Sequence, residues 1–470
     1  MRTDTTVQGL NCLRSPEREH GFEDLNVPPG QIPKDLRGTL YRVGPGQFAD
    51  KRGSYGHWFD GEGLLTALRF AEGRVSFACR MIKPHGADRP DYVKRGRIGR
   101  APQGFARIVR SFLDPQAFVN TANTALLHWQ GRLYALFEAS LPTQIDPDTL
   151  ETLGETDLDV IVRSFGAHPH IHAPSGAIIN HGFRPPPHAG IDYYTLPPEG
   201  PAQHTHYVPI SGRFPAHDVS VTDRHIVTVL SPLYLEVAQI LTGGAVADCL
   251  DWRPGEQTDC IISPIGGGPH TVLKTNPMLY THSVNAFEDG EIIVVQGLAA
   301  RDATPVDWVS KVRRGCKSLA PQPAPVRLTE VQIDLAARRV EVDTLFETPA
   351  EFPAIDPRFA GRRHSVIYAT GFRDDAAAYA DFQDAILRFD LTSRTVEKVD
   401  FGAGHFVSEP IFIPAGAREG EGWLLCQTYD AHADTSYAVL LRAGETMEVI
   451  ARFPLGQALA MSLHGLWVPG

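Results

Sequence analysis

Several features that mark common protein classes are missing from this sequence. No run of about 18 apolar residues occurs, so we expect no membrane-spanning helix. The opening residues MRTDTTVQGLNCLRSPEREH have no apolar core, which argues against a secretory signal. Acidic residues outnumber basic ones, 55 to 44, and no basic stripe is visible, so nucleic acid is not an expected partner. We therefore expect a cytoplasmic protein.

Cysteine pairs and nucleotide-binding fingerprints are also missing. The six cysteines are scattered and none forms a CxxC pair, so we expect reduced, mostly buried thiols. No Rossmann or P-loop fingerprint is present. The glycines of SPIGGGPH (263–270) lack a strand before them and a helix after them, which indicates a loop.

Glycine and proline, by contrast, are plentiful, with 43 and 37 residues. Short strand-like runs recur along the chain, and several form hairpins with Gly or Asp in the turn: RFAEGRVSF, HWQGRLYAL and AFEDGEIIV. Two or more hairpins in each roughly 50 to 65 residues would make four-stranded units. Seven such units fill most of the chain. We predict an all-β fold, a seven-bladed β-propeller that forms one domain over 1–470, with short helical excursions capping one face.

Two segments depart from the strand pattern. Residues 92–113 are basic with Phe and Ile interleaved, and are expected to be partly helical. Residues 231–252 are apolar and are expected to be helical in their first half. Both are either ordinary excursions packed over one face or an apolar entrance that touches a membrane surface. The second interpretation predicts peripheral membrane contact through 231–250 and 92–113.

Four of the 19 histidines share a context that the others lack. Each stands at or near the start of an extended run, and their successive separations are 49, 65 and 182 residues. Those separations approximate one, one and three propeller units, so the four side chains would converge on the central axis. The histidines are His168, His217, His282 and His464.

A local site is the alternative, because His168, His170 and His172 stand at alternate positions of SFGAHPHIHAPSG. Alternate residues of a strand are roughly 6.5 to 7 Å apart, which is too far for joint chelation without a tight bend. Pro169 also makes this run a poor regular strand. We therefore predict that His170 and His172 are turn or surface residues.

At these residues the sequence resembles the carotenoid cleavage oxygenase family, which includes apocarotenoid oxygenases, stilbene-cleaving oxygenases and the retinyl-ester isomerase. The resemblance covers nearly the whole chain and rests on several motifs in the family's order. They are GTLYRVGPGQF (38–48), HWFDGEGLL (57–65), NTANTALLHWQGRLYALFEASLPTQIDPDTLETLG (120–154), AHPHIHAPSG (167–176), HDVSVTDRHIV (217–227), HSVNAFEDG (282–290), SEPIFIP (408–414) and HGLW (464–467).

The resemblance implies a seven-bladed propeller with one Fe(II) per chain on its axis, held by His168, His217, His282 and His464. It also implies that three glutamates hold three of these histidines, without fixing which glutamate holds which histidine. A ligating imidazole needs its other N–H held, and a carboxylate does this while raising the basicity of the ligand. The glutamates are Glu138, Glu351 and Glu409.

Two further residues bear on the reaction that the resemblance implies, the cleavage of an alkene by O2. Thr124 matches a position near the open coordination site, where its methyl group would restrict what binds the metal. Phe137 stands where stilbene-cleaving members carry a lysine that binds a phenolic hydroxyl, and we expect it to be buried. A buried Phe cannot activate a phenol, so a lipophilic carotenoid or apocarotenoid is favoured as the substrate.

Two alternatives remain open. The first is a dioxygenase for a stilbene or phenylpropanoid, in which another residue would bind the hydroxyl. The second is a propeller that only binds an apocarotenoid or a partner, against which the complete set of histidines and glutamates argues. The sequence gives neither the bond that is cleaved nor the oligomeric state.

Overall fold

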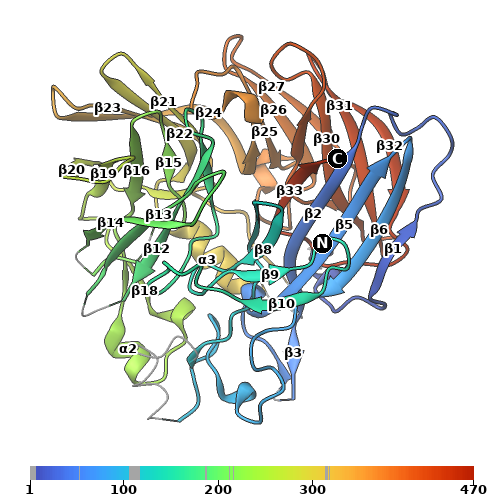
Figure 1. The fold of residues 1–470 in the computed structure, drawn as a ribbon, viewed down its shortest axis with the longest axis horizontal. Coiled ribbons are helices and arrows are strands. Elements are labelled where there is room, and N and C mark those ends of the chain that lie inside the picture. The colour runs from blue at the N-terminus through green and yellow to red at the C-terminus, as the bar shows by residue number, and fades with distance from the viewer. Residues whose placement is uncertain are drawn as a thin grey trace, which may run out of the picture.

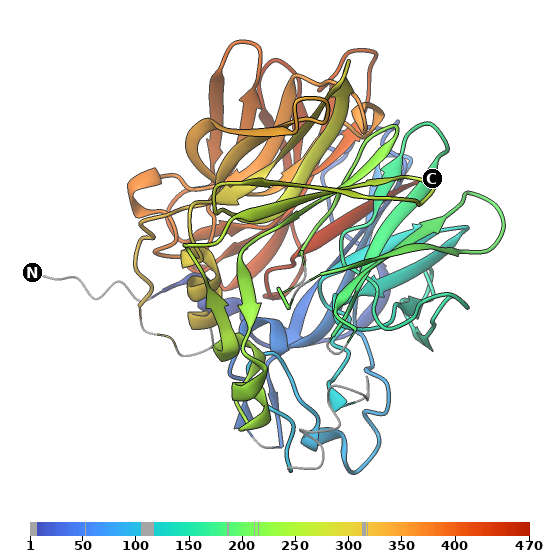
Figure 2. The ribbon, with the colours of Figure 1, turned by 90° about the vertical axis from the view of Figure 1, so that its left-hand side faces the viewer.

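The fold is described from a computed structural model of the chain. It describes residues 7–51, 53–104, 117–185, 188–210, 212–214, 216–312, 316 and 318–470. Strands dominate it, arranged as sheets around a centre, and the few helices lie at one side (Figures 1 and 2). The all-β prediction is confirmed.

The sheets form seven blades, each running from an inner strand near the axis to an outer strand. In that order, blade 1 contains β33 (His464–Pro469), β2 (Gly38–Gln47), β5 (Glu62–Ala71), β6 (Arg74–Met81) and β1 (His20–Asp24). Blade 2 contains β7 (Ala125–Trp129), β8 (Arg132–Leu136), β9 (Thr143–Ile145) and β10 (Thr152–Glu155). Blade 3 contains β11 (His170–His172), β12 (Ala177–Arg184), β13 (Gly190–Leu196) and β14 (Gln203–Pro209). Blade 4 contains β15 (Ser220–Val221), β16 (His225–Leu230), β19 (Thr258–Pro264) and β20 (Thr271–Thr275).

The last three blades follow the same plan. Blade 5 contains β21 (Leu279–Asp289), β22 (Ile292–Ala300), β23 (Arg327–Asp334) and the first part of β24 (Arg339–Ala354). Blade 6 contains the end of β24, β25 (Val366–Gly371), β26 (Ala385–Asp390) and β27 (Thr395–Asp400). Blade 7 contains β28 (His405–Val407) and β29 (Ile411–Pro414), both paired with β30 (Gly422–Asp430), then β31 (Thr435–Ala443) and β32 (Glu448–Pro454).

Two strands join neighbouring parts of the ring. The long strand β24 pairs with β23 mainly through its first residues and with β25 through its last, so it is the outer strand of blade 5 and the inner strand of blade 6. The final strand β33 pairs with β2, so the end of the chain closes blade 1 next to the axis. Joining the two ends of the chain in one blade closes the ring of the propeller.

Turn residues explain why the hairpins form where the sequence predicts them. Glu72 and Gly73 connect β5 to β6 with φ of 54° and 77°, and Gln130 and Gly131 connect β7 to β8 with φ of 49° and 74°. Two successive residues with positive φ match the right-handed twist of the flanking strands. The second residue is glycine in both turns, since glycine adopts positive φ without a steric penalty.

Apolar side chains fill all seven interfaces between neighbouring blades. On β8 the alternation of a strand is visible, because Leu133 and Ala135 pack with blade 1 while Tyr134 and Leu136 pack with blade 3. The same arrangement continues around the ring to blade 7, which packs on blade 1 through Leu425, Phe453 and their neighbours. All six cysteines are free and five are buried, as predicted.

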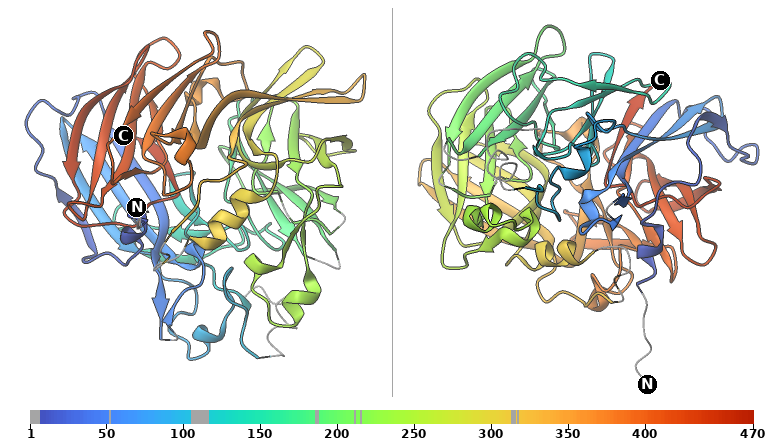
Figure 3. Two further views of the ribbon diagram at one scale, coloured as in Figure 1. Left: turned by 180° about the vertical axis from the view of Figure 1, so that it is seen from behind. Right: turned by 90° about the horizontal axis from the view of Figure 1, so that it is seen from below.

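Short helices, turns and two-stranded ribbons cover one face of the propeller, as predicted. They lie at the lower side in Figure 1, and Figure 3 shows them from behind and from below. They are β3 (Ala49–Asp50), β4 (Gly53–Ser54), β17 (Leu233–Leu235), α2 (Val237–Leu241), β18 (Leu250–Trp252), α3 (Thr304–Lys311) and the 3-10 turns Gly9–Cys12, Trp58–Asp60, Tyr92–Lys94, Val246–Cys249 and Asp375–Ala377. The 3-10 turn Pro357–Phe359 lies at the opposite face, where Asn285 of β21 donates to the Phe359 carbonyl at 3.0 Å.

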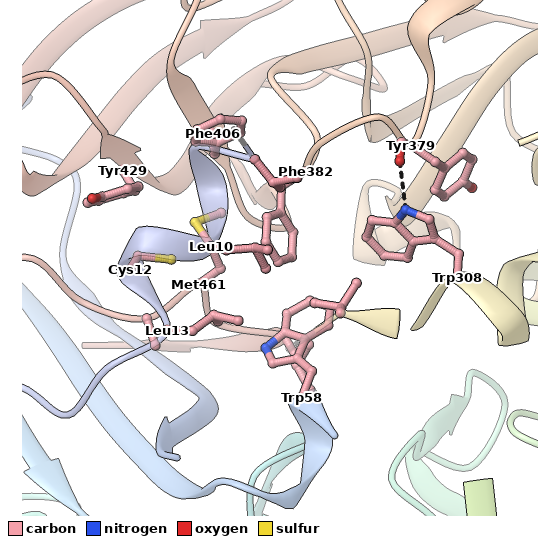
Figure 4. Packing of buried hydrophobic residues seen from close by; sticks show 14 of the residues in the cluster. Leu10, Cys12, Leu13, Trp58, Trp308, Tyr379, Phe382, Phe406, Tyr429 and Met461 are labelled. Atoms are coloured by element: carbon pink, nitrogen blue, oxygen red, sulfur yellow. Dashed lines mark hydrogen bonds between the residues drawn. The ribbon is translucent and has the colours of Figure 1, made fainter. Parts of the chain in front are cut away.

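An aromatic cluster fastens several of these elements together (Figure 4). The Trp308 indole of α3 donates a hydrogen bond to the Tyr379 carbonyl at 2.6 Å. The rings of Trp58 and Phe382 meet edge to face at 5.0 Å, beside Leu10 of the first 3-10 turn. Segments from both ends and the middle of the chain therefore share one apolar core. Among the described helices, none has the length and apolar character needed to cross a bilayer.

The prediction for 231–252 needs correction. Only the end of its first half is helical, as the five-residue α2; the residues before it form β17, which pairs with β18. Leu233 and Leu235 stand at alternate positions and pair with Trp252 and Leu250, which fixes an extended backbone, and two glycines follow α2. In 92–113, only Tyr92–Lys94 is helical among the described residues, and 105–116 lie outside them.

Candidate metal centre

The four predicted histidines meet at the centre of the propeller. His168 and His217 stand just before the innermost strands β11 and β15, His282 lies within β21, and His464 begins β33. Their ring centroids lie 4.5 to 5.3 Å apart for the neighbouring pairs. Nitrogen atoms of His168, His282 and His464 all lie within 4.8 Å of one another and could hold a metal ion.

Three glutamates bind the outer nitrogens of three of these rings, and the structure gives their pairing. Glu138 contacts Nδ1 of His217. Glu351 Oε2 accepts from Nδ1 of His282 at 2.8 Å, and Glu409 Oε1 accepts from Nδ1 of His464 at 2.9 Å. Within the described residues, no hydrogen bond joins His168 to a carboxylate.

The chemistry of this donor set fits a bound cation. An imidazole that donates its Nδ1–H to a carboxylate turns the lone pair of Nε2 toward the centre. Nε2 of His217 lies 3.0 Å from Nε2 of His168 and 3.2 Å from Nε2 of His282. Lone pairs at these distances repel unless positive charge lies among them, so the centre is built to attract a cation.

The pKa shifts agree with this charge pattern. Burial opposes a charge on His217, but the Glu138 carboxylate outweighs burial and raises the pKa of His217 to about 9. Burial, reinforced by the neighbouring imidazoles, holds the pKa of His168 well below its usual value. His168 therefore faces the centre as a neutral imidazole, the form that ligates metals.

A buried arginine that the sequence reasoning missed fixes Glu409. The Arg42 guanidinium donates to the Glu409 carbonyl at 2.8 Å and to Ser462 Oγ at 2.7 Å. The backbone N–H of Gly465 donates to the second carboxylate oxygen at 2.7 Å. Both carboxylate oxygens are thus held. The only sequence signal for Arg42 is a charge inside the otherwise uncharged strand run GTLYRVG.

Phe352 is a second residue that the sequence reasoning missed. It follows Glu351 directly, and its backbone φ is 53°, a left-handed conformation that a bulky residue rarely adopts. Its ring centroid lies 5.7 Å from that of His282 and 5.3 Å from that of His464. The strained backbone directs an aromatic ring onto two of the four imidazoles.

Within the described residues, no hydrogen bond or ring contact joins the remaining candidates, Thr124 and Phe137, to the four histidines. The Thr124 hydroxyl donates to Asn123 Oδ1 at 3.1 Å just before β7. Phe137 is half-buried, not buried as expected, because it stands beyond the end of β8 where the strand leaves the sheet. The roles of Thr124 and Phe137 in the reaction stay predictions.

His170 and His172 are neither turn nor surface residues. Both belong to β11, where Ile178 and its neighbours on β12 hold the run extended despite Pro169. His170 Nε2 bonds Asp218 Oδ1 at 2.7 Å, and buried His172 bonds the Asp223 carbonyl at 2.9 Å. Only His168 of this run joins the central cluster.

Fold and site together define a class of protein: a seven-bladed β-propeller whose axis carries a cluster of imidazoles that could hold one metal ion. Comparison with known proteins gives the particular family. Residues 13–469 match the retinal pigment epithelial membrane protein family. The chain belongs to this family.

The chain is similar to two curated oxygenases along almost its whole length. It is 29% identical to apocarotenoid-15,15'-oxygenase from Synechocystis sp., covering 96% of this chain and 94% of the relative. It is 27% identical to resveratrol cleavage oxygenase 1 from Aspergillus fumigatus, covering 94% and 91%. The crystal structure of cobalt-substituted Synechocystis apocarotenoid oxygenase matches with a TM-score of 0.88 and 28% identity over 98% of each chain. These relatives place the chain among the oxygenases of the family.

Proposed function

We propose that this protein is a non-haem Fe(II) dioxygenase that cleaves one C=C bond of a carotenoid or apocarotenoid. The observation that carries the proposal is the axial cluster, in which three of four inward-facing imidazoles are backed by carboxylates. The overall reaction consumes one O2 per alkene: the C=C bond breaks, and each carbon receives one oxygen atom as an aldehyde or ketone. No further reductant is needed.

In this proposal the metal is held by His168, His217, His282 and His464. Bound there, Fe(II) would supply the activation of O2 that the chemistry requires, and imidazole ligands suit iron among other metals. Glu138, Glu351 and Glu409 keep Nδ1 protonated on their partner rings and so keep each Nε2 available as a donor. Arg42 holds the backbone carbonyl of Glu409, and the Phe352 ring lies against the imidazoles of His282 and His464.

An apolar polyene is the proposed substrate because of Phe137 and the comparison with the apocarotenoid oxygenase of Synechocystis. Phe137 offers no charge or hydrogen bond to a phenol. The second candidate is a stilbene or phenylpropanoid alkene, which the similarity to a resveratrol cleavage oxygenase favours. Replacing Phe137 with Lys is expected to raise activity on a hydroxystilbene relative to a polyene if the first proposal is right.

The proposal is tested by loading the protein with Fe(II) under anaerobic conditions and measuring O2 uptake. The panel contains a full-length carotenoid, an apocarotenal and a hydroxystilbene, with products identified by mass. We expect carbonyl products from the polyenes, with one atom of ¹⁸O2 in each product. Cleavage of the stilbene but of neither polyene would contradict the proposed substrate. ¹⁸O in only one of the two carbonyl products would contradict the dioxygenase stoichiometry. An absence of O2 uptake with every compound would contradict the proposed function.

We also propose that 231–250 contacts a membrane surface, from which a carotenoid would be drawn. Leu241 of α2 is 40% exposed, whereas Ile240 beside it is buried and serves the core. Leu241→Glu is therefore expected to weaken liposome flotation, and Leu153→Glu, at an exposed position on blade 2, is the matched control. Equal flotation of both variants would contradict the contact.

The other segment predicted to contact a membrane, 92–113, is described only up to residue 104. There Tyr92, Arg95 and Arg97 are buried, so this part offers less apolar surface to a membrane than 231–250 does.

A further inference from the structure

A cavity of about 280 Å³ lies on the axis of the propeller, beside the histidine cluster. Every blade contributes to its lining, from Leu466 of blade 1 to Glu409 of blade 7. At its inner end it is lined by His168, His282 and His464. The cavity is therefore continuous with the centre that could hold the metal.

The outer end of the cavity reaches the surface of the protein. Ile171 lines it and is 52% exposed. From His168 to Ile171 the chain runs along β11, away from the face that carries the short helices. The strands of blade 5 identify that face: β22 ends there and leads into α3. Its antiparallel partner β21 therefore begins at the same face, near His282. The cavity thus opens on the face opposite the helices.

The lining is suited to a cation. Asp218, which is buried, lines the cavity and bonds Nε2 of His170 through one oxygen at 2.7 Å. Its other oxygen accepts the backbone N–H of Ser283 at 2.7 Å, so the carboxylate is fixed in place. Among the described residues that line the cavity, none is Lys or Arg. Asp218 and Glu409 therefore place two carboxylates in the lining, each bonded to an imidazole, with no lysine or arginine among the described lining residues to cancel their charge.

The size also fits. A water molecule occupies about 30 Å³ in the liquid, so a cavity of this volume has room for roughly nine. A divalent ion with six waters fits within that space. A carboxylate and an imidazole met on the way can replace some of these waters before the four central imidazoles replace the rest.

We propose that this axial cavity is the route by which a hydrated divalent metal ion reaches the four histidines, with Asp218 and His170 as its first contacts. The inference rests on the proposed function, because it takes the histidine cluster to be the metal centre. It assigns the open face of the propeller to metal loading, a task separate from the binding of an apolar substrate.

The test measures the rate of metal loading and the final metal content separately. Apoprotein is mixed with Co²⁺, and its absorption is followed in a stopped-flow instrument; cobalt content is then measured after equilibration. Ile171→Trp narrows the mouth of the cavity, and Val449→Trp, at a 44% exposed position on β32, is the matched control. We expect Ile171→Trp to slow cobalt loading at least about tenfold and still to bind one cobalt per chain at equilibrium. Val449→Trp is expected to match the wild type in both loading rate and final cobalt content.

Asp218→Asn tests the charge in the same experiment, because it removes the carboxylate charge and keeps the shape. We expect it also to slow loading. Equal loading rates for Ile171→Trp and the wild type would overturn the route, and slow loading by Ile171→Trp with normal loading by Asp218→Asn would overturn the role of Asp218. Failure of the proposed function looks different: wild-type protein would then take up no stoichiometric cobalt at equilibrium.

Discussion

Four blades of this propeller bring a histidine to the axis, and the other three bring a glutamate. Histidines come from blades 1, 3, 4 and 5, and glutamates from blades 2, 6 and 7. His282 and His464 are each paired with the glutamate of an adjacent blade, while Glu138 of blade 2 reaches past blade 3 to His217. Among the described residues, no carboxylate bonds His168 of blade 3, the fourth member of the set.

This difference separates two kinds of imidazole in one centre. The three that are bonded to glutamates have a fixed tautomer and orientation, because a carboxylate holds their Nδ1–H. His168 is kept neutral by burial and by its imidazole neighbours, which lower its pKa. We infer that the carboxylate-bonded histidines set the geometry of the centre. His168 would be the fourth nitrogen donor, and unlike the other three it brings no carboxylate with it.

The largest expected effect comes from removing a carboxylate-bonded histidine. His282→Ala deletes one donor and leaves the partly buried Glu351 without its imidazole partner, so metal retention and turnover are expected to be lost together. Metal content after gel filtration and O2 uptake are the measurements. His225→Ala is the matched control, since His225 at the start of β16 also bonds a glutamate at 3.0 Å, Glu288, which lies six residues along β21 from His282. Full activity of His282→Ala without metal would refute the mechanism.

Removing a single carboxylate charge is expected to have a smaller effect. Glu351→Gln keeps the shape and an acceptor oxygen but loses the negative charge that accepts the Nδ1–H of His282. Loss of such an outer partner typically costs 10- to 100-fold in metal affinity or activity, and we expect about this loss for Glu351→Gln. Competition with a chelator gives the affinity. Glu288→Gln serves as the control, and equal affinities of the two variants would break the distinction between the two kinds of imidazole.

How far the sequence predicted this arrangement depends on the range of the interaction. Hairpins such as Glu72–Gly73 follow from local turn chemistry, so the strands and the propeller could be predicted. The four histidines share a local context at strand starts, and the family resemblance pointed to the same four. The pairing of Glu138 with His217 joins residues far apart in sequence, and no local pattern records it.

Other features were not predicted from the sequence, for related reasons. No Gly, Asn or Asp marks the point where β24 passes from blade 5 to blade 6, and Pro349, which stands there, lies within the continuous strand. His170 and His172 were misassigned because Pro169 was taken to break a strand whose pairing with β12 depends on tertiary structure. The extent of one domain over 1–470 stays a prediction, which a single calorimetric unfolding transition would support.

A third experiment contrasts buried carboxylates with and without a cationic partner. Burial raises the pKa of Asp381 to about 6, although backbone N–H groups of Phe382, Gln8 and Gly9 oppose the shift. Beside His217, in contrast, burial is outweighed and the pKa of Glu138 is lowered. The protonated form of Asp381 is therefore favoured by folding, so its contribution to stability is present below about pH 4 and is lost as the pH rises through 6.

Asp381→Asn removes this titration. Relative to the variant, the wild type is expected to lose about 1 to 3 kcal/mol of unfolding free energy between pH 4 and pH 7, because one pKa unit corresponds to about 1.4 kcal/mol. Denaturant unfolding of the apoproteins at both pH values gives the difference. A constant difference across this range would show that Asp381 does not titrate as its burial implies. Groups common to both proteins, including Asp60, cancel in the comparison.

The smallest expected effect concerns Phe352, which touches two carboxylate-bonded imidazoles, those of His282 and His464. Phe352→Leu keeps an apolar side chain and removes the ring contacts, which are typically worth about 0.5 to 1.5 kcal/mol. We expect metal to dissociate roughly two- to tenfold faster, with loading through the axial cavity unchanged. Phe346→Leu, in the core between blades 5 and 6, removes an aromatic contact of similar size away from the centre. If both variants release metal at the wild-type rate, the carboxylates alone hold these two imidazoles, and the left-handed backbone at Phe352 has a purpose unrelated to the metal.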